Sequence, residues 1–178
     1  QDSQTPVDEV ASSLRQLASD SRVVAIGETG LDYFYHPESK QLQQQNFAAH
    51  IEVAQELDKP LIIHTRDAGE DTISLLKEGG AEKSGGVLHC FTESLEMAKQ
   101  AIDELDFYIS ISGIASFANA KSLREVVKAL PLERLLIETD SPWLAPVPHR
   151  GKQNQPAYVV DVAKCVADVK GLTLNEVA

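Results

Sequence analysis

Short continuous apolar runs alternate with helical patterns along the chain. Five runs of mostly branched residues predict strands that are buried on both faces, as in a parallel sheet. They cover residues 23–28, 60–64, 86–89, 107–112 and 135–138. The runs recur every 20 to 40 residues or so, which is typical of βα units. No GxGxxG segment opens a helix, so a Rossmann-type sheet is disfavoured.

Helical signals fill the intervals between these runs. Thr5 is expected to cap a first helix that begins at Pro6 and buries Val10, Leu14 and Leu17 along one stripe. A second helix is expected after Pro37. The side chains predicted for its buried face are Phe47, Ile51, Ala54 and Leu57. The further signals, in chain order, are a cap at Thr92, a helix over 119–130, a stripe of Val159, Val162, Val166 and Val169 that stops at Gly171, and a capping box from Thr173 to Glu176.

Ionisable residues end or closely follow four of the predicted strands: Glu28, His64, His89 and Asp140. Alternation along a strand places Val24 and Ile26 on the side of Glu28, Ile62 on that of His64, and Val87 on that of His89. In a (β/α)₈ barrel the carboxyl ends of the strands converge on the face that holds the active site. This convergence favours a barrel for the present chain.

Each of these residues also has a plain structural explanation. A single histidine after an apolar run can be a hydrogen-bonded core residue, and Asp140 before Ser141 and Pro142 fits a helix N-cap. Two carboxylates and two imidazoles on one buried rim are costly without a cation. Imidazole nitrogen and carboxylate oxygen are ligands of Zn²⁺, Mn²⁺ and Fe²⁺ in hydrolytic sites, so the joint pattern favours a metal site.

Several blocks resemble the signature segments of the TatD family of deoxyribonucleases. They are Gly27 to Asp32, His64 to Ala68, Gly86 to Phe91, Ser112-Gly113, Glu138 to Pro142, and the loop Pro148 to Lys152 with Asn154 and Pro156. The resemblance runs from Val23 onward and is closest to the YcfH-like bacterial branch. It implies a TIM-type (β/α)₈ barrel of the amidohydrolase-like kind, with two divalent metal ions (Mg²⁺, Zn²⁺ or Mn²⁺) that act on phosphodiester bonds of DNA.

The same resemblance implies a role for each ligand. Glu28 would bridge both ions, and His64 and His89 would bind the second. Asp140 would bind the first ion and accept the proton of the nucleophilic water, which makes Asp140 and Glu28 the expected catalytic residues. Ligation alone is the simpler alternative for Asp140.

The chain departs from the family pattern in its histidines. The family's first strand ends in His-x-His, and none of the five histidines here are so spaced. The five strands are therefore expected to be strands four to eight of one incomplete barrel over residues 1–178, with strands one to three and the end of the C-terminal helix missing. Such a chain would be at most half loaded with metal and catalytically poor.

Candidate substrate contacts lie in the loop after the last predicted strand. Arg150 and Lys152 occupy a stretch without acidic residues between Asp140 and Asp161, and would neutralise phosphates of a DNA substrate. A solvated turn is the alternative, mainly for Lys152. The resemblance adds Asn154 to this substrate-binding set. The aromatic side chains at residues 33–35 could offer a stacking face for a base, although packing is favoured for at least two of them.

The composition sets limits on this picture. A net charge of −11 argues against a broad DNA-binding surface but not against a metal site that holds a few nucleotides. The two cysteines, Cys90 and Cys165, fit a reducing compartment, and no signal peptide or membrane span is predicted. We expect a cytoplasmic protein that is monomeric when complete. The alternative functions are hydrolysis of a C–N bond in a small cyclic amide and a non-catalytic metal-binding scaffold.

Overall fold

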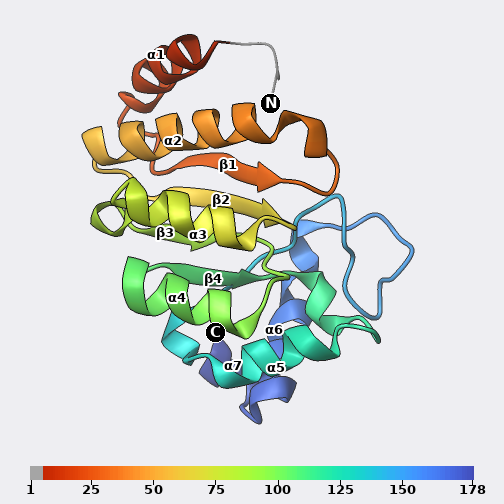
Figure 1. Ribbon diagram of the computed structural model, residues 1–178. Helices are drawn as coiled ribbons and strands as arrows, with labels where there is room; N and C mark the ends of the chain where they lie inside the picture. Colours follow the sequence, from red (N-terminus) through yellow and green to blue (C-terminus); the bar gives the residue numbers. More distant parts are fainter. Residues whose placement is uncertain (1–5) are drawn as a thin grey trace. The chain divides into compact units, whose positions relative to one another are not determined.

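The computed structural model describes residues 6–178 (Figure 1). This part of the chain alternates strands with helices, as the apolar runs predict. The elements in order are α1 (Val7–Ala18), β1 (Ile26–Asp32), α2 (Lys40–Glu56), β2 (Leu61–Arg66), α3 (Gly69–Glu78), β3 (Gly86–Leu88), α4 (Leu95–Leu105), β4 (Tyr108–Ile111), α5 (Lys121–Ala129), β5 (Leu135–Ile137), α6 (Val159–Lys170) and α7 (Leu174–Val177). None of the helices in residues 6–178 has the length and apolar character that a bilayer crossing requires.

The chain divides into two compact units. Unit 1 comprises Gln1–Leu88 and Gln100–Phe107, and unit 2 comprises His89–Lys99 and Tyr108–Ala178. The strands of each unit are parallel and follow one another in sequence order, β1–β2–β3 in unit 1 and β4–β5 in unit 2.

The core of unit 1 lies between its strands and the helices that cover them. In β2 the burial alternates, so Leu61 and Ile63 are fully buried while Ile62 and His64 share the half-exposed side. Helix α2 packs on β1 and contributes Phe47 and other fully buried side chains. The predicted pairing of Ile62 with His64 on one face is confirmed.

Unit 2 is built around β4, β5 and α6. Strand β4 contributes the buried Ile109 and Ile111, and its register pairs Ile111 with Ile137. Helix α6 packs against α5, α7 and the 3-10 turn Gly113–Ser116. It ends at Gly171, whose φ of +68° is the left-handed conformation expected of a glycine C-cap. The predicted capping box at Thr173 is confirmed and opens α7.

Several expected boundaries were wrong. Helix α1 begins at Val7 with Pro6 as its N-cap residue, and Leu17 is 69% exposed because Ala11 and Ala18 occupy the buried positions. The cap expected at Thr5 lies outside the described residues. Helix α4 is capped by Ser94, whose hydroxyl accepts from the Met97 N–H at 3.2 Å, and not by Thr92. Helix α5 begins at Lys121 rather than at residue 119.

Helix α3 was not predicted at all. It buries only Thr72, Ile73 and Leu76, and Thr72 is satisfied by a hydrogen bond between its hydroxyl and that of Thr65 at 3.0 Å. A search for apolar periodicity does not count a buried threonine. Ile73 and Leu76, one turn apart, are then the only buried apolar side chains that indicate this helix.

Strand β1 was placed too early in the sequence. It starts at Ile26 and continues to Asp32, whereas Val24 lies before it and is 78% exposed. Glu28 is therefore the third residue of the strand and not its end. The alternation expected for Val24, Ile26 and Glu28 was wrong because the register with β2 is interrupted between Ile26 and Thr29.

Candidate metal centre

The register interruption in β1 sets the position of Glu28. Regular pairing resumes at Thr29, opposite Ile63, so residues 27 and 28 lie in the irregular stretch. A bulge of this kind re-aims the side chain it carries. The Glu28 side chain is 53% exposed and its carboxylate reaches toward β2, where Oε1 lies 3.2 Å from His64 Nδ1.

Gly30 brings β1 close to β2 at the level of His64. The two residues are register partners, and Gly30 has a φ of +138°. A Cβ at this position would lie 1.9 Å from the carbonyl oxygen of His64. Only glycine permits this approach, so Gly30 allows β1 to lie against the backbone that presents His64.

The imidazole of His64 lies between two carboxylates. Its Nδ1 faces Glu28, and its Nε2 lies 3.1 Å from Asp32 Oδ2. The hydrogen bond with Glu28 raises the pKa of His64 above its ordinary value, burial opposes the rise, and Asp32 adds to it. Asp32 also accepts from the Tyr35 N–H at 2.8 Å, which holds its carboxylate in place. The carboxylate of Asp32 can only accept, so it holds a hydrogen on Nε2. When an ion takes the place of the hydrogen between Nδ1 and Glu28, Nδ1 is left as the lone-pair donor.

His89 has a carboxylate partner of its own. It directly follows the last residue of β3, and its Nδ1 lies 2.9 Å from Glu138 Oε1. The other oxygen of Glu138 accepts from the hydroxyl of the buried Ser110. Burial acts most strongly on Glu138 and raises its pKa, but the hydrogen bonds from His89 and Ser110 outweigh it, so the pKa lies below its ordinary value. An ionised Glu138 leaves Nε2 of His89 as the lone-pair donor.

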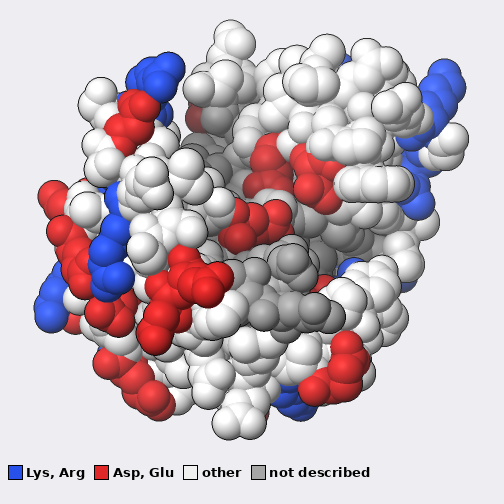
Figure 2. All heavy atoms as spheres, turned by 90° about the horizontal axis from the view of Figure 1, so that it is seen from above, with Lys and Arg blue, Asp and Glu red and all other residues white. Residues whose placement is uncertain are grey.

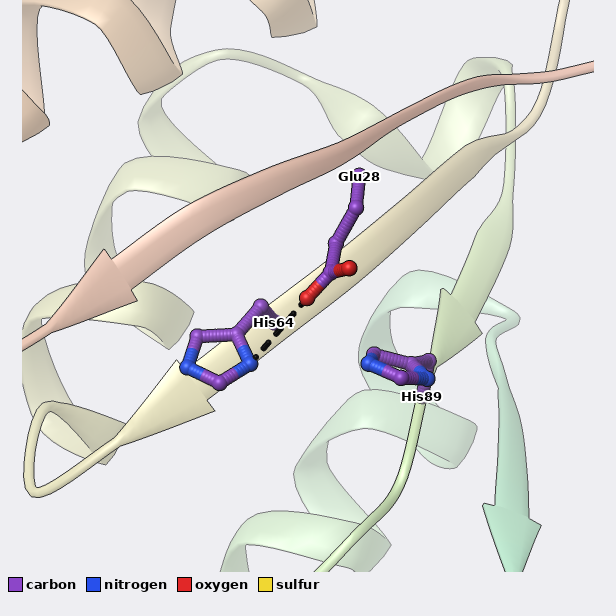
Figure 3. Close-up of side chains that lie close together, drawn as sticks. All are labelled: Glu28, His64 and His89. Carbon is purple, nitrogen blue, oxygen red and sulfur yellow. Dashed lines mark ion pairs between the residues drawn. The ribbon is translucent and has the colours of Figure 1, made fainter. Parts of the chain in front are cut away.

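Three of the four predicted ligands come together. Glu28, His64 and His89 each offer a ligand atom, and these atoms all lie within 4.8 Å of one another (Figure 3). Tetrahedral coordination by Zn²⁺ at ligand distances of about 2.0–2.2 Å places the ligand atoms about 3.3–3.6 Å from one another. Side-chain shifts of about an ångström would therefore bring the three donors onto one ion. The donor set, two imidazoles and a carboxylate, suits a divalent transition metal.

Asp140 is not part of this group of described residues. It lies three residues beyond the end of β5, with a φ of +56°, and its carbonyl oxygen accepts from the Trp143 N–H at 2.9 Å. The residues that follow form turns up to the 3-10 helix Pro156–Tyr158, so the alternative explanation of Asp140 as a helix N-cap was wrong. Its predicted role as a metal ligand stays a prediction.

A cleft in unit 1 opens onto the side chains of Glu28 and His64. It has a volume of about 460 Å³ and runs between β1 and the start of α2, where Gln43 and Asn46 form part of its wall. Gln43 donates to the carbonyl oxygens of Asp32 and His36 and so ties α2 to the end of β1. Solvent and solutes can therefore reach the Glu28 carboxylate.

The loop after β5 carries the predicted substrate contacts. Arg150 and Lys152 are exposed, and the Arg150 guanidinium stacks 3.6 Å from the ring centroid of Phe117. Asn154 is only 3% exposed, and its amide group donates to the carbonyl oxygens of Thr139 and Trp143. Both amide hydrogens are used within the loop, which points to a positioning role rather than the substrate contact expected from the sequence.

Of the three aromatic residues at 33–35, only Tyr33 is partly buried against other side chains. Its hydroxyl donates to Asp71 at 2.7 Å, whereas Phe34 and Tyr35 are 53% and 62% exposed and contact each other edge to face. The guanidinium of Arg66 lies 4.4 Å from the centroid of Phe34. The expectation that at least two of these residues are packed was therefore wrong.

Sequence comparison decides the family. The profile described as "TatD related DNase" matches residues 1–178. The chain belongs to the TatD family. It is 57% identical over 165 residues to YcfH of Escherichia coli K12, named an uncharacterized metal-dependent hydrolase, covering 93% of this chain and 62% of that protein. It is 48% identical over 165 residues to YabD of Bacillus subtilis, which carries the same description, covering 93% and 64%.

Solved structures agree with this assignment. The YjjV TatD homolog of Escherichia coli K12 matches with a TM-score of 0.85 and 27% identity, over 96% of this chain and 64% of that one. A TatD-family hydrolase of Entamoeba histolytica matches with a TM-score of 0.79 and 27% identity, over 98% and 65%. The predicted family and the TIM-barrel-like α/β fold with parallel strands are confirmed. The chain spans somewhat less than two thirds of the length of these relatives.

Proposed function

We propose that this chain carries the metal centre of a divalent-metal-dependent hydrolase that cleaves phosphodiester bonds in DNA. The observation that supports the proposal most is the convergence of Glu28, His64 and His89, whose ligand atoms lie within 4.8 Å of one another. The family's description as DNase-related supports the substrate class. The names of the relatives support metal-dependent hydrolysis in general.

The side chains of the site have distinct tasks in this proposal. His64 and His89 supply nitrogen donors whose tautomers are selected by Asp32 and Glu138. Glu28 supplies a carboxylate that is open to the cleft. Asp140 accepts the proton of the attacking water, which a carboxylate close to that water can do. A divalent ion, when bound, lowers the pKa of water and neutralises charge on the phosphodiester.

The finer parts of the prediction belong to the same proposal. We propose two ions, since two-metal sites suit in-line displacement at phosphorus. Glu28 would serve both ions, Asp140 would hold the first, and His64 and His89 would hold the second. We also propose that β1 to β5 correspond to strands four to eight of the eight-stranded barrel.

Charge explains why the substrate needs specific basic contacts. The chain has a net charge of −11, and acidic side chains are numerous on the face drawn in Figure 2, near its middle and at its edges. Such a surface repels a polyanion unless cations are supplied locally. We propose that Arg150 and Lys152 supply them and contact phosphates beside the scissile bond.

The test is metal-dependent cleavage of DNA by the purified intact protein. With Mg²⁺, Mn²⁺ or Zn²⁺ we expect cleavage that a chelator abolishes. Glu28→Ala should remove turnover, because the ion loses a charged ligand. Arg150→Ala should instead raise KM with a smaller effect on kcat, while Lys128→Ala on the exposed face of α5 serves as the control for loss of a positive charge.

Two results would overturn the proposal. Metal-loaded protein that is inert on DNA but opens a dihydropyrimidine ring would assign it to C–N hydrolysis. Metal-loaded protein that cleaves neither DNA nor a dihydropyrimidine would be assigned as a non-catalytic metal-binding scaffold.

A further inference from the structure

Trp143 is the only tryptophan of the chain and one of its most exposed apolar side chains. Its relative exposure is 70%, although tryptophan is among the residues that gain most from burial. It lies in unit 2, three residues after Asp140, in the loop that leaves β5. Tryptophan is enriched at binding interfaces, so an exposed indole close to a candidate active-site residue is a candidate contact for a ligand.

The backbone around Trp143 is fixed on both sides. Its N–H donates to the carbonyl oxygen of Asp140 at 2.9 Å, and its own carbonyl oxygen accepts from the amide group of Asn154. Asn154 is 3% exposed, and its backbone N–H donates to the carbonyl oxygen of Pro142 at 3.0 Å. The two limbs of the loop are thus tied together beside Trp143. The indole is held outward by an ordered backbone and does not belong to a freely moving segment.

A groove of about 480 Å³ lies beside the indole. Its lining includes Trp143, Leu144, Arg150 and Lys152. The guanidinium of Arg150 lies 3.6 Å from the ring centroid of Phe117. This contact limits the rotation of the Arg150 side chain, while the residue remains exposed to solvent. No acidic residue occurs between Asp140 and Asp161, so the positive charge of the groove is not cancelled along this stretch.

We propose that this groove is a nucleotide subsite, in which an unpaired base stacks on Trp143 while Arg150 and Lys152 hold the adjoining phosphates. An aromatic face next to basic side chains is the combination that binds single-stranded nucleic acid. A paired base is stacked within its duplex and is not available to the indole, so the subsite selects single-stranded DNA or frayed ends. This inference deepens the proposed function and rests on it for the location of the scissile bond near Asp140.

The fluorescence of the single tryptophan reports on the subsite directly. The protein is titrated with a dT12 oligonucleotide in excess chelator, so that no cleavage occurs, and we expect quenching. A hairpin duplex with blunt ends and an abasic oligonucleotide with the same number of phosphates should quench weakly. The abasic strand separates stacking from attraction between charges.

Variants are compared by the anisotropy of a labelled dT12, since Trp143→Ala has no fluorescence of its own. Trp143→Ala should weaken binding by about tenfold or more, and Trp143→Phe should restore most of it. Arg150→Ala and Lys152→Ala should each weaken binding and flatten its dependence on salt. Lys128→Ala should leave the affinity unchanged.

Failure of the subsite and failure of the proposed function give different results. Quenching by dT12 from a protein that cleaves no DNA with any metal would support the subsite and overturn the hydrolysis. DNA cleavage together with unchanged binding in Trp143→Ala would overturn the subsite alone. Equal affinity for the abasic strand and for dT12 would also overturn it, as would equal quenching by a polyglutamate peptide.

Discussion

Asp32→Asn tests whether the carboxylate beside Nε2 of His64 prepares this histidine for metal binding. Asp32 holds the Tyr35 N–H through Oδ1 at 2.8 Å and faces His64 Nε2 through Oδ2 at 3.1 Å. An asparagine must keep its carbonyl oxygen on the Tyr35 N–H, because its amide nitrogen cannot accept that hydrogen. The amide nitrogen then faces His64 and donates to Nε2.

This reversal changes the tautomer of His64. A ring that accepts at Nε2 carries its hydrogen on Nδ1, the nitrogen that lies 3.2 Å from Glu28 Oε1. The ion must then displace that hydrogen or use a ring in the wrong orientation. Loss of such an outer partner usually costs 10–100-fold in metal affinity, or about 1.4–2.7 kcal/mol. The shape of the side chain is unchanged, so little stability should be lost.

The assay is competition for Zn²⁺ or Mn²⁺ with a chromophoric chelator, with the melting temperature of the metal-free protein as the check on folding. Asp20→Asn is the control, because Asp20 also accepts side-chain hydrogen bonds in unit 1 but pairs with Arg22, away from the site. Unchanged metal affinity in Asp32→Asn, with an intact fold, would refute the proposed role of Asp32.

Two further predictions concern stability. Gly30→Ala places a Cβ 1.9 Å from the His64 carbonyl oxygen and should lower the free energy of unfolding in denaturant by at least about 2 kcal/mol, whereas Gly151→Ala, with a positive φ but open space around it, should cost less. Equal losses of unfolding free energy in Gly30→Ala and Gly151→Ala would show that the close approach of β1 to β2 does not require a glycine at residue 30. Burial lowers the pKa of His50, so the unfolded chain takes up the proton first, and stability should decline as the pH falls below about 6.5. His50→Gln should remove this part of the decline, and a pH profile identical to that of the wild type would count against the buried neutral imidazole.

The residues that could be predicted from the sequence share one property: a regular pattern marks them. The alternation of Leu61 to His64 is uninterrupted, so His64 was placed on the correct face. The strand with Glu28 could not be placed as well, because its glycines carry no side-chain signal and its pairing is irregular. Helix α3 escaped notice because a hydrogen-bonded threonine takes a core position.

The partners of the histidines lay beyond what a pattern can show. Asp32 and Glu138 both stand in the segments that resemble the family, so the residues were visible, but their pairing depends on three-dimensional placement. Asp32 reaches His64 because the register sets it opposite Arg66, beside the histidine. Glu138 meets His89 from 49 positions away in sequence. The exposure of Trp143 likewise depends on hydrogen bonds that Asn154 makes across the loop.

We propose that Glu28, His64 and His89 together bind one divalent ion. Anomalous scattering at the zinc absorption edge, from crystals of the protein soaked in Zn²⁺, tests it most directly. We predict a peak about 2.0–2.2 Å from a Glu28 carboxylate oxygen, Nδ1 of His64 and Nε2 of His89. A peak bound through Nε2 of His64 would contradict the tautomer assignment. Zinc found only elsewhere on the protein would contradict the metal centre itself.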